Sequence, residues 1–254
     1  RYFEAYLWGA AGQLPDESKI FGHEYAPGIT AGDDIFTVMS SDIFRGSAFA
    51  LGYVNPDNLR GMNIWSDMYK VIRKANLMLA RMDECQDMTA LDRRNYTGYI
   101  HFLRGYAYYH ILMTCGPAIL VGDEIFESNL EGPAYNTYRA TYDETVEYIC
   151  SELETAAAYL PLKASIAQFE RPTKGAAYAL IARLRLHAAS PLFNGTSTAR
   201  LYFGNWKRTY DKEYYVNQNY SEEKWALAAA ACKRVIDMNV YELFTVSKDQ
   251  NTPQ

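Results

Sequence analysis

The chain has 254 residues, of which 49% are hydrophobic and 22% are charged, and its formal net charge is −5 at pH 7. This length and composition predict a folded globular protein and exclude a disordered or low-complexity chain. The acidic balance excludes a chain-wide attraction for nucleic acid, and no apolar run approaches the roughly 18 residues of a membrane-spanning helix.

The first feature along the chain is an irregular stretch, residues 12–61, in which aromatic and polar side chains are mixed. Loops of this length in a compact domain are usually functional or disordered, and the density of rings argues against disorder. A binding site is therefore expected here or in a second irregular, aromatic stretch, residues 191–220.

Helical periodicity begins near residue 62. Apolar residues recur every three or four positions from Ile64 to Met82, which predicts an amphipathic helix. The segment Tyr96–Met113 is apolar almost all round with Gly105 near its middle, which predicts a buried helix that crosses a neighbour closely. The first stripe consists of Ile64, Met68, Ile72, Ala75, Leu79 and Met82.

Two later segments, residues 140–160 and 221–240, are amphipathic and carry acidic residues in their first turns. Pro161 ends the first of them, and Ser221 is the expected N-cap of the second. Their predicted apolar stripes are Val146, Ile149, Leu153, Ala156 and Leu160 in the one, and Trp225, Ala229, Cys232, Ile236 and Val240 in the other.

The segment Arg171–Gly195 is alanine-rich and basic, a combination that could suit a phosphate or nucleic-acid surface. Its arginines and His187 fall largely off the apolar stripe and suit the negative end of a helix dipole. Thr173 is a good N-cap, and Ser190-Pro191 ends the helix. We therefore predict a packing helix, with an apolar stripe of Ala177, Leu180, Ile181, Leu184 and Ala188.

Broadly buried helices thus alternate with amphipathic ones, as in tetratricopeptide repeats, and only short stretches such as Ala118–Val121 could form strands. The predicted fold is mostly α, with tetratricopeptide-like helix pairs and long irregular insertions in a single region, residues 1–254. Stacked helix pairs form a surface for a partner more often than a catalytic cleft. The predicted helical scaffold covers residues 62–113, 140–160, 172–190 and 221–240, with irregular loops at 12–61 and 191–220.

Four ordered motifs carry a family resemblance. They are IWSDMYKVIRKANLML, GYIHFLRGYAYYHILMTCGPAILV, RPTKGAAYALIARLRLHAASPLFNG and KWALAAAACKRVIDMNVYELF. Together they resemble the SusD/RagB family of Bacteroidetes outer-membrane lipoproteins, over nearly all of residues 1–246. The resemblance implies four tetratricopeptide-like helix pairs with an irregular ligand-binding region. Members of the family are usually about twice this length, so the chain is expected to correspond to their N-terminal half.

The resemblance also implies a role. SusD-like proteins are cell-surface nutrient binders that cover a SusC-like TonB-dependent transporter of the outer membrane, and they have no catalytic activity and no cofactor. They bind oligosaccharides or polysaccharides, and in some branches peptides. Membrane attachment is expected only through an N-terminal lipid anchor, which is inferred from the family because its lipidated cysteine is not in this chain.

A carbohydrate site needs flat rings against the C–H faces of the sugar, and polar side chains that pair with its hydroxyl groups. The loop at residues 44–58 has this mixture, although for any single residue packing against the core is the favoured alternative. The predicted ligand-binding residues are Phe44, Arg45, Phe49, Tyr53, Asn55 and Asn58. A competing site, or a transporter contact, is expected at Tyr202, Phe203, Trp206 and Tyr210.

Catalysis is the weaker alternative. Asp33, Asp34 and Asp42 could serve glycoside hydrolysis, but adjacent carboxylates more often stabilise turns. The histidines lack metal-ligand spacing, the cysteines form no C-x-x-C pair, and no metal site is expected. We expect the cysteines to behave as small buried hydrophobes, with a disulfide as the alternative that the sequence leaves open. They are Cys85, Cys115, Cys150 and Cys232. A third class, a helical-repeat scaffold whose main ligand is a protein, follows from the helix pairs alone.

Overall fold

The computed structural model describes residues 2–16, 28–33, 35–38, 46–55, 57–59, 63–126, 132 and 137–243. These residues form helices and no strand, apart from two isolated bridges. The expected mostly α fold of packed helix pairs is confirmed. The helices are α1 (Tyr2–Ala11), α2 (Ser47–Ala50), α3 (Trp65–Arg81), α4 (Ala90–Cys115), α5 (Tyr142–Tyr159), α6 (Lys174–Ala189), α7 (Ser197–Phe203) and α8 (Glu222–Asp237), with short 3-10 turns at Ile29–Ala31, Met82–Glu84 and Ile166–Gln168.

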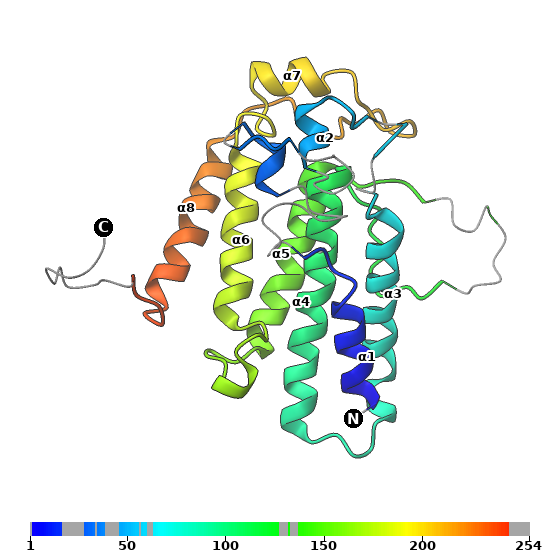
Figure 1. Cartoon of the computed structure of the whole chain (residues 1–254), viewed down its shortest axis with the longest axis vertical. Coiled ribbons are helices and arrows are strands. Elements are labelled where there is room, and N and C mark those ends of the chain that lie inside the picture. The colour runs from blue at the N-terminus through cyan, green and yellow to red at the C-terminus, as the bar shows by residue number, and fades with distance from the viewer. Residues whose placement is uncertain are drawn as a thin grey trace, which may run out of the picture.

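The long helices lie side by side in the order α3, α4, α5, α6, α8, and α1 packs on α3 (Figure 1). Each helix therefore packs mainly on its neighbour in the chain. The short helices α2 and α7 are both at one end of this array (Figure 1). None of the helices in the described part of the chain is long and apolar enough to cross a membrane.

The crossing of α4 and α5 confirms the role expected for Gly105. A Cβ atom at this position would lie 3.2 Å from Cβ of Glu152 and 3.3 Å from the side chain of Leu153. At Gly98 a Cβ would lie 3.1 Å from Leu160. These glycines let the two helix backbones approach, because any larger side chain would fill the space that α5 occupies.

The segment Ala118–Val121, the most strand-like in sequence, has no strand partner among the described residues. Its backbone is bonded by tyrosine hydroxyls instead. The Tyr69 hydroxyl donates to Ile119 O at 2.9 Å and accepts from Ile119 N at 2.8 Å, and the Tyr108 hydroxyl accepts from Val121 N at 3.1 Å. Buried backbone groups need partners, and here side chains of α3, α4 and α5 supply them, because Thr145 Oγ1 of α5 accepts from Ala118 N at 3.3 Å.

Arg104 of α4 completes this attachment. Its side chain is only 3% exposed, and its Nε and Nη2 atoms bind both carboxylate oxygens of Glu152 on α5 at 2.8 and 2.7 Å. Its Nη1 atom donates to Asn76 Oδ1 at 2.8 Å and to Asp123 Oδ1 at 2.6 Å. The Asn76 amide in turn donates to the backbone of Gly122 at 2.9 Å. We call Tyr69, Asn76, Arg104 and Tyr108 the buried clamp.

The helix α6 confirms the packing interpretation of the basic segment. All five predicted stripe residues are at most 9% exposed, and the Thr173 hydroxyl accepts from Ala176 N as an N-cap. The basic side chains have protein partners: Arg185 pairs with Glu147, and His187 Nδ1 lies 2.8 Å from the hydroxyl of Tyr142.

Four expectations need correction. The predicted stripe of α8 faces away from the described core: Trp225 is 41% and Ile236 is 73% exposed. Ser221 precedes α8, but its side chain makes no capping hydrogen bond. The stretch 191–220 contains the helix α7. All four cysteines are free, but only Cys150 is buried, whereas Cys232 is exposed.

Candidate functional site

The predicted ligand loop is described in part. Phe44 and Arg45 lie outside the described residues. The short helix α2 anchors the loop through Ser47 and Ala48, which are 2% and 0% exposed. Phe49 and Tyr53 in the same loop are 42% and 52% exposed. Two rings of the predicted set thus present part of their surface to solvent.

The two asparagines of this loop form a local turn. Asn55 and Asn58 exchange backbone hydrogen bonds at 3.1 and 3.0 Å. The Asn55 Oδ1 atom accepts from Asp57 N at 3.0 Å and from Asn58 N at 2.9 Å. The acceptor of Asn55 therefore shapes the turn, and its amide nitrogen is the group that could donate to a ligand.

A second pair of exposed rings joins two irregular segments. Tyr138 and Tyr210 are 62% and 53% exposed, and their ring centroids are 4.4 Å apart. Tyr210 belongs to the predicted competing set, whereas Tyr138 was missed. Of the other members of that set, Phe203 packs against Phe193 at 5.8 Å and so serves the core.

Arg208 fixes the ring pair to the scaffold. It is 6% exposed, its guanidinium lies 5.2 Å from the centroid of the Tyr210 ring, and it contacts three carboxylates. It donates to Glu144 at 2.9 Å and to Asp211 at 2.7 Å, and it also pairs with Glu213. Desolvation opposes its charge, but the hydrogen bond to Asp211 and the charge of Glu144 prevail and raise the pKa of Arg208.

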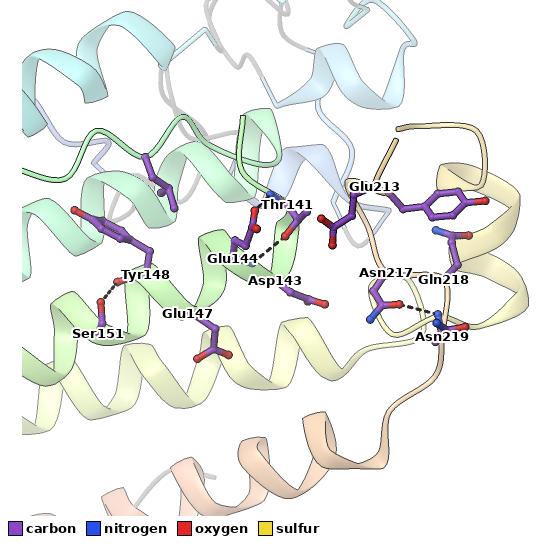
Figure 2. Close-up of a pocket in the computed structure, with 12 residues that line it drawn as sticks. Thr141, Asp143, Glu144, Glu147, Tyr148, Ser151, Glu213, Asn217, Gln218 and Asn219 are labelled. Carbon is purple, nitrogen blue, oxygen red and sulfur yellow. Dashed lines mark hydrogen bonds between the residues drawn. The ribbon is translucent and has the colours of Figure 1, made fainter. Parts of the chain in front are cut away.

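Beside Arg208 lies a groove of about 1140 Å³ between the first turns of α5 and residues 213–219 (Figure 2). Glu144 and Glu213, both bound to Arg208, line it from the two sides. The ring pair is therefore connected to the groove through one buried arginine. The groove is lined by Leu120, Thr141, Asp143, Glu144, Glu147, Tyr148, Ser151, Glu213, Tyr214, Asn217, Gln218 and Asn219.

The carboxylates that line the groove also stabilise the fold. Glu144 accepts from Thr141 N at 2.6 Å and closes the capping box of α5. Asp143 pairs with Lys224 at 2.6 Å, and Glu147 pairs with Arg185. These pairs hold α5 against α6 and α8, so an acidic groove wall is compatible with a stable fold.

Two polar atoms in the groove wall have no hydrogen-bond partner in the described part of the chain: the hydroxyl of Tyr148 and Oε1 of Gln218. Burial, and next the charge of Glu152, raise the pKa of Tyr148 to about 12, so that its hydroxyl stays protonated and able to donate. The carboxylates and amides that line the groove, beside exposed rings, can bind a polyhydroxylated ligand through hydrogen bonds and ring contacts.

The candidate catalytic and metal groups do not assemble into a site that the structure describes. Asp34 and Asp42 lie outside the described residues, and Asp33 is exposed. Within the described ranges, no group of three or more histidine, cysteine or carboxylate side chains is arranged to hold a metal ion.

Comparisons with known proteins agree with this architecture. A family model of the SusD-like group, described as "Starch-binding associating with outer membrane", matches residues 32–186. None of the curated proteins matches the chain.

Solved structures match with similar folds. A SusD homologue from Bacteroides thetaiotaomicron has a TM-score of 0.65 at 21% identity, and surface glycan-binding protein A from Bacteroides uniformis has a TM-score of 0.63 at 19% identity. A laminarin-binding SusD-like protein has a TM-score of 0.59 at 23% identity. The matches cover 95%, 96% and 74% of this chain, but only 41%, 47% and 40% of the respective structures.

Proposed function

This chain belongs to the SusD-like family of carbohydrate-binding proteins associated with the outer membrane, and on that premise we propose that it binds a glycan at the cell surface without chemical turnover. It delivers the bound oligosaccharide or polysaccharide to a SusC-like TonB-dependent transporter, which is its partner. An N-terminal lipid anchor holds the protein to the membrane.

The observation that carries this proposal is the family match over residues 32–186. The surface chemistry supports it, because exposed rings occur in two places near one end of the helical array. One is the loop with Phe49 and Tyr53, and the other is the pair Tyr138–Tyr210. A ring held by the scaffold costs little conformational entropy when it stacks on a sugar.

The loop at residues 44–58 is the proposed primary ligand surface. Phe49 and Tyr53 supply ring faces, and Asn55 and Asn58 supply amide groups. Phe44 and Arg45, which lie outside the described residues, are proposed as ligand contacts from the sequence alone. The Tyr138–Tyr210 pair is the competing surface. One set of variants can show which of these two surfaces binds the ligand.

Isothermal titration calorimetry against a panel of oligosaccharides and polysaccharides tests the function. In the double variant Phe49→Ala/Tyr53→Ala, the Kd of the bound glycan is expected to rise by about tenfold or more, equivalent to about 1.4 kcal/mol. If the same loss follows Tyr138→Ala/Tyr210→Ala instead, the competing surface is the primary site.

The control is Tyr2→Ala. Tyr2 is 91% exposed and is the first residue of α1, whose N-terminal end is opposite α2 and α7 in the array (Figure 1), so its loss should leave glycan binding unchanged. If the full natural polypeptide binds no glycan but binds peptides, the ligand class is wrong and the peptide-binding alternative replaces it.

A helical-repeat scaffold remains the second candidate function, because the packed helix pairs offer a surface for a protein. A protein partner that is still captured after all four ring substitutions, in the absence of any glycan binding, would favour it. Release of reducing ends from a bound glycan would contradict the proposal of binding without turnover.

A further inference from the structure

The ring pair, Tyr138 and Tyr210, joins two irregular segments that are far apart in the chain. The two rings are 62% and 53% exposed, and their centroids are 4.4 Å apart. Exposed rings on irregular segments can take up many positions unless other contacts hold them. The contacts that hold each segment therefore decide whether the pair exists before a ligand arrives.

Arg139 holds the segment that carries Tyr138. Its Nη1 atom donates to Cys115 O at 2.8 Å and to Pro117 O at 3.2 Å, at the C-terminal end of α4. Its guanidinium lies 4.5 Å from the centroid of the Trp65 ring, at the start of α3. The residue next to Tyr138 is thus tied to two helices at once.

Arg208 closes the turn that carries Tyr210. Its backbone N donates to Glu213 O at 2.8 Å. Its side chain contacts the carboxylates of Asp211 and Glu213 within the turn, and that of Glu144 on α5 outside it. Because its guanidinium also lies 5.2 Å from the centroid of the Tyr210 ring, one side chain fixes the turn, the ring and their attachment to α5.

The same turn contains an unfavourable backbone conformation. Lys212 has a φ of 65°, in the left-handed region that is unfavourable for a residue with a side chain. Such a conformation persists where surrounding contacts over-determine it, and here Lys212 N donates to Arg208 O at 3.1 Å. Weaker Arg208 contacts should therefore loosen the turn, and with it the Tyr210 ring.

Neither arginine presents a free cationic surface. Arg208 is 6% exposed, and Arg139 is half-buried. The donors of Arg208 bond three carboxylates, and those of Arg139 bond backbone carbonyls. Their influence on a ligand therefore passes through the rings that they hold. A ring that is already in place loses little conformational entropy when a sugar stacks on it.

We propose that Arg139 and Arg208 are positioning residues, which fix Tyr138 and Tyr210 as one platform before a glycan stacks on it. This inference deepens the proposed function and rests on it, with the ring pair as a ligand surface. It adds two residues that bind no sugar themselves but set the affinity of the rings that do.

The platform can be measured without a ligand. The probe is 3-fluorotyrosine placed at position 138, whose fluorine NMR shift senses the ring current of Tyr210. Removal of that ring by Tyr210→Ala gives the shift of a separated pair. In Arg139→Lys and in Arg208→Lys, the shift should move at least about half of the way to this value, because lysine keeps the charge but lacks the fork that bonds several acceptors.

The matched control is Arg94→Lys. Arg94 Nη2 also donates to a backbone carbonyl, Ala158 O at 3.1 Å, but at the end of α5 opposite the ring pair. This substitution should leave the fluorine shift unchanged, whatever its effect on the Tm. A change that reports only general loosening of the fold would appear in all three variants.

A double-mutant cycle connects the platform to binding. The probes are laminarin and the starch oligosaccharide maltoheptaose, after the glycans named for one matched structure and for the family. In calorimetry, each arginine-to-lysine change should raise the Kd about threefold to tenfold, because a ring must then be ordered on binding. In the Tyr138→Ala/Tyr210→Ala background, the same changes should raise it less than about twofold, because the rings through which they act are absent.

Three results would overturn the proposal. The first is a fluorine shift that keeps its original value in both arginine variants. The second is a Kd that neither variant changes, and the third is an equal rise in Kd with and without the rings, which would leave the arginines a structural role alone. If neither probe binds but the shift moves in both arginine variants and not in Arg94→Lys, the proposed function fails for these glycans and the positioning of the rings stands.

Discussion

Tyrosines are used in opposite ways in two regions of this molecule. In the buried clamp, the hydroxyls of Tyr69 and Tyr108 bind the backbone of residues 119–121, and the Tyr108 side chain is fully buried. At the outer end of the array, Tyr138 and Tyr210 expose 62% and 53% of their surfaces. The strongest sequence motifs therefore mark internal hydrogen bonds, whereas the candidate ligand contacts lie in the irregular segments.

The largest expected effect is in the buried clamp. Arg104→Ala leaves the carboxylate of Glu152 without its bidentate partner in a site only 7% exposed. Removal of one member of a buried ion pair costs about 3–5 kcal/mol, so the free energy of unfolding from urea titration should fall by that amount. The control is Arg93→Ala, which removes the exposed pair Arg93–Asp83 and should cost at most about 1 kcal/mol. Equal losses would show that the clamp is not an anchor.

A pH titration tests another buried side chain of α4, His110. Burial, and next the charge of Arg183, lower the pKa of His110 from 6.5 to about 4. Because the folded pKa is the lower one, the stabilising contribution is complete above pH 6.5 and is lost as the pH falls toward 4. The loss is at most about 3 kcal/mol. Unfolding measured by urea from pH 7 to pH 4 should show a shallower pH slope for His110→Phe, and an unchanged slope would contradict a buried neutral histidine.

Removal of a single hydroxyl oxygen compares the buried and the exposed kind of tyrosine directly. Tyr108→Phe removes the acceptor of Val121 N in a buried site and should cost about 1–3 kcal/mol. Tyr138→Phe removes a hydroxyl from an exposed ring and should change the free energy of unfolding by less than about 0.5 kcal/mol. Thermal unfolding of both variants gives the comparison, and a costlier Tyr138→Phe would reverse it.

The smallest effect on stability is expected for removal of the exposed Tyr210 ring, although its effect on glycan binding could be large. Tyr210→Ala removes an exposed ring that stacks on Tyr138 and faces Arg208, and should destabilise the protein by about 1 kcal/mol or less. If the ring pair contacts the ligand, the Kd for the glycan should nevertheless rise by about tenfold. Calorimetry and thermal unfolding on the same sample separate these readouts, and unchanged binding would remove the pair from the site.

The helices were predictable because their signals are local. The stripes at Val146–Leu160 and Ala177–Ala188 are buried as expected, and Thr173 is the cap of α6. Gly105 marked the close crossing because glycine destabilises a helix interior unless the missing side chain makes room for a neighbouring backbone. The short helix α7 was missed because seven residues leave too little periodicity to distinguish it from a loop.

The candidate site was predictable only in part. Phe49 and Tyr53 were named from composition and are exposed, and their role in binding is still a prediction. Tyr138 was missed because its partner, Tyr210, is 72 positions away in the chain, 210 minus 138, and no local pattern connects them. The groove was missed for the same reason, since one wall is α5 and the other is residues 213–219.

The sequence by itself determined the long helices α3, α4, α5, α6 and α8, their apolar faces and the family, because periodicity, caps and ordered motifs are properties of neighbouring residues. Only the tertiary structure decided which apolar faces are covered. The stripes of α5 and α8 look alike in sequence, yet one is buried and the other exposed. It also decided that motif residues of α3 and α4 bind the backbone of residues 119–126, and that the exposed rings of Tyr138 and Tyr210 pack against each other. Both depend on contacts between distant residues, which local patterns do not encode.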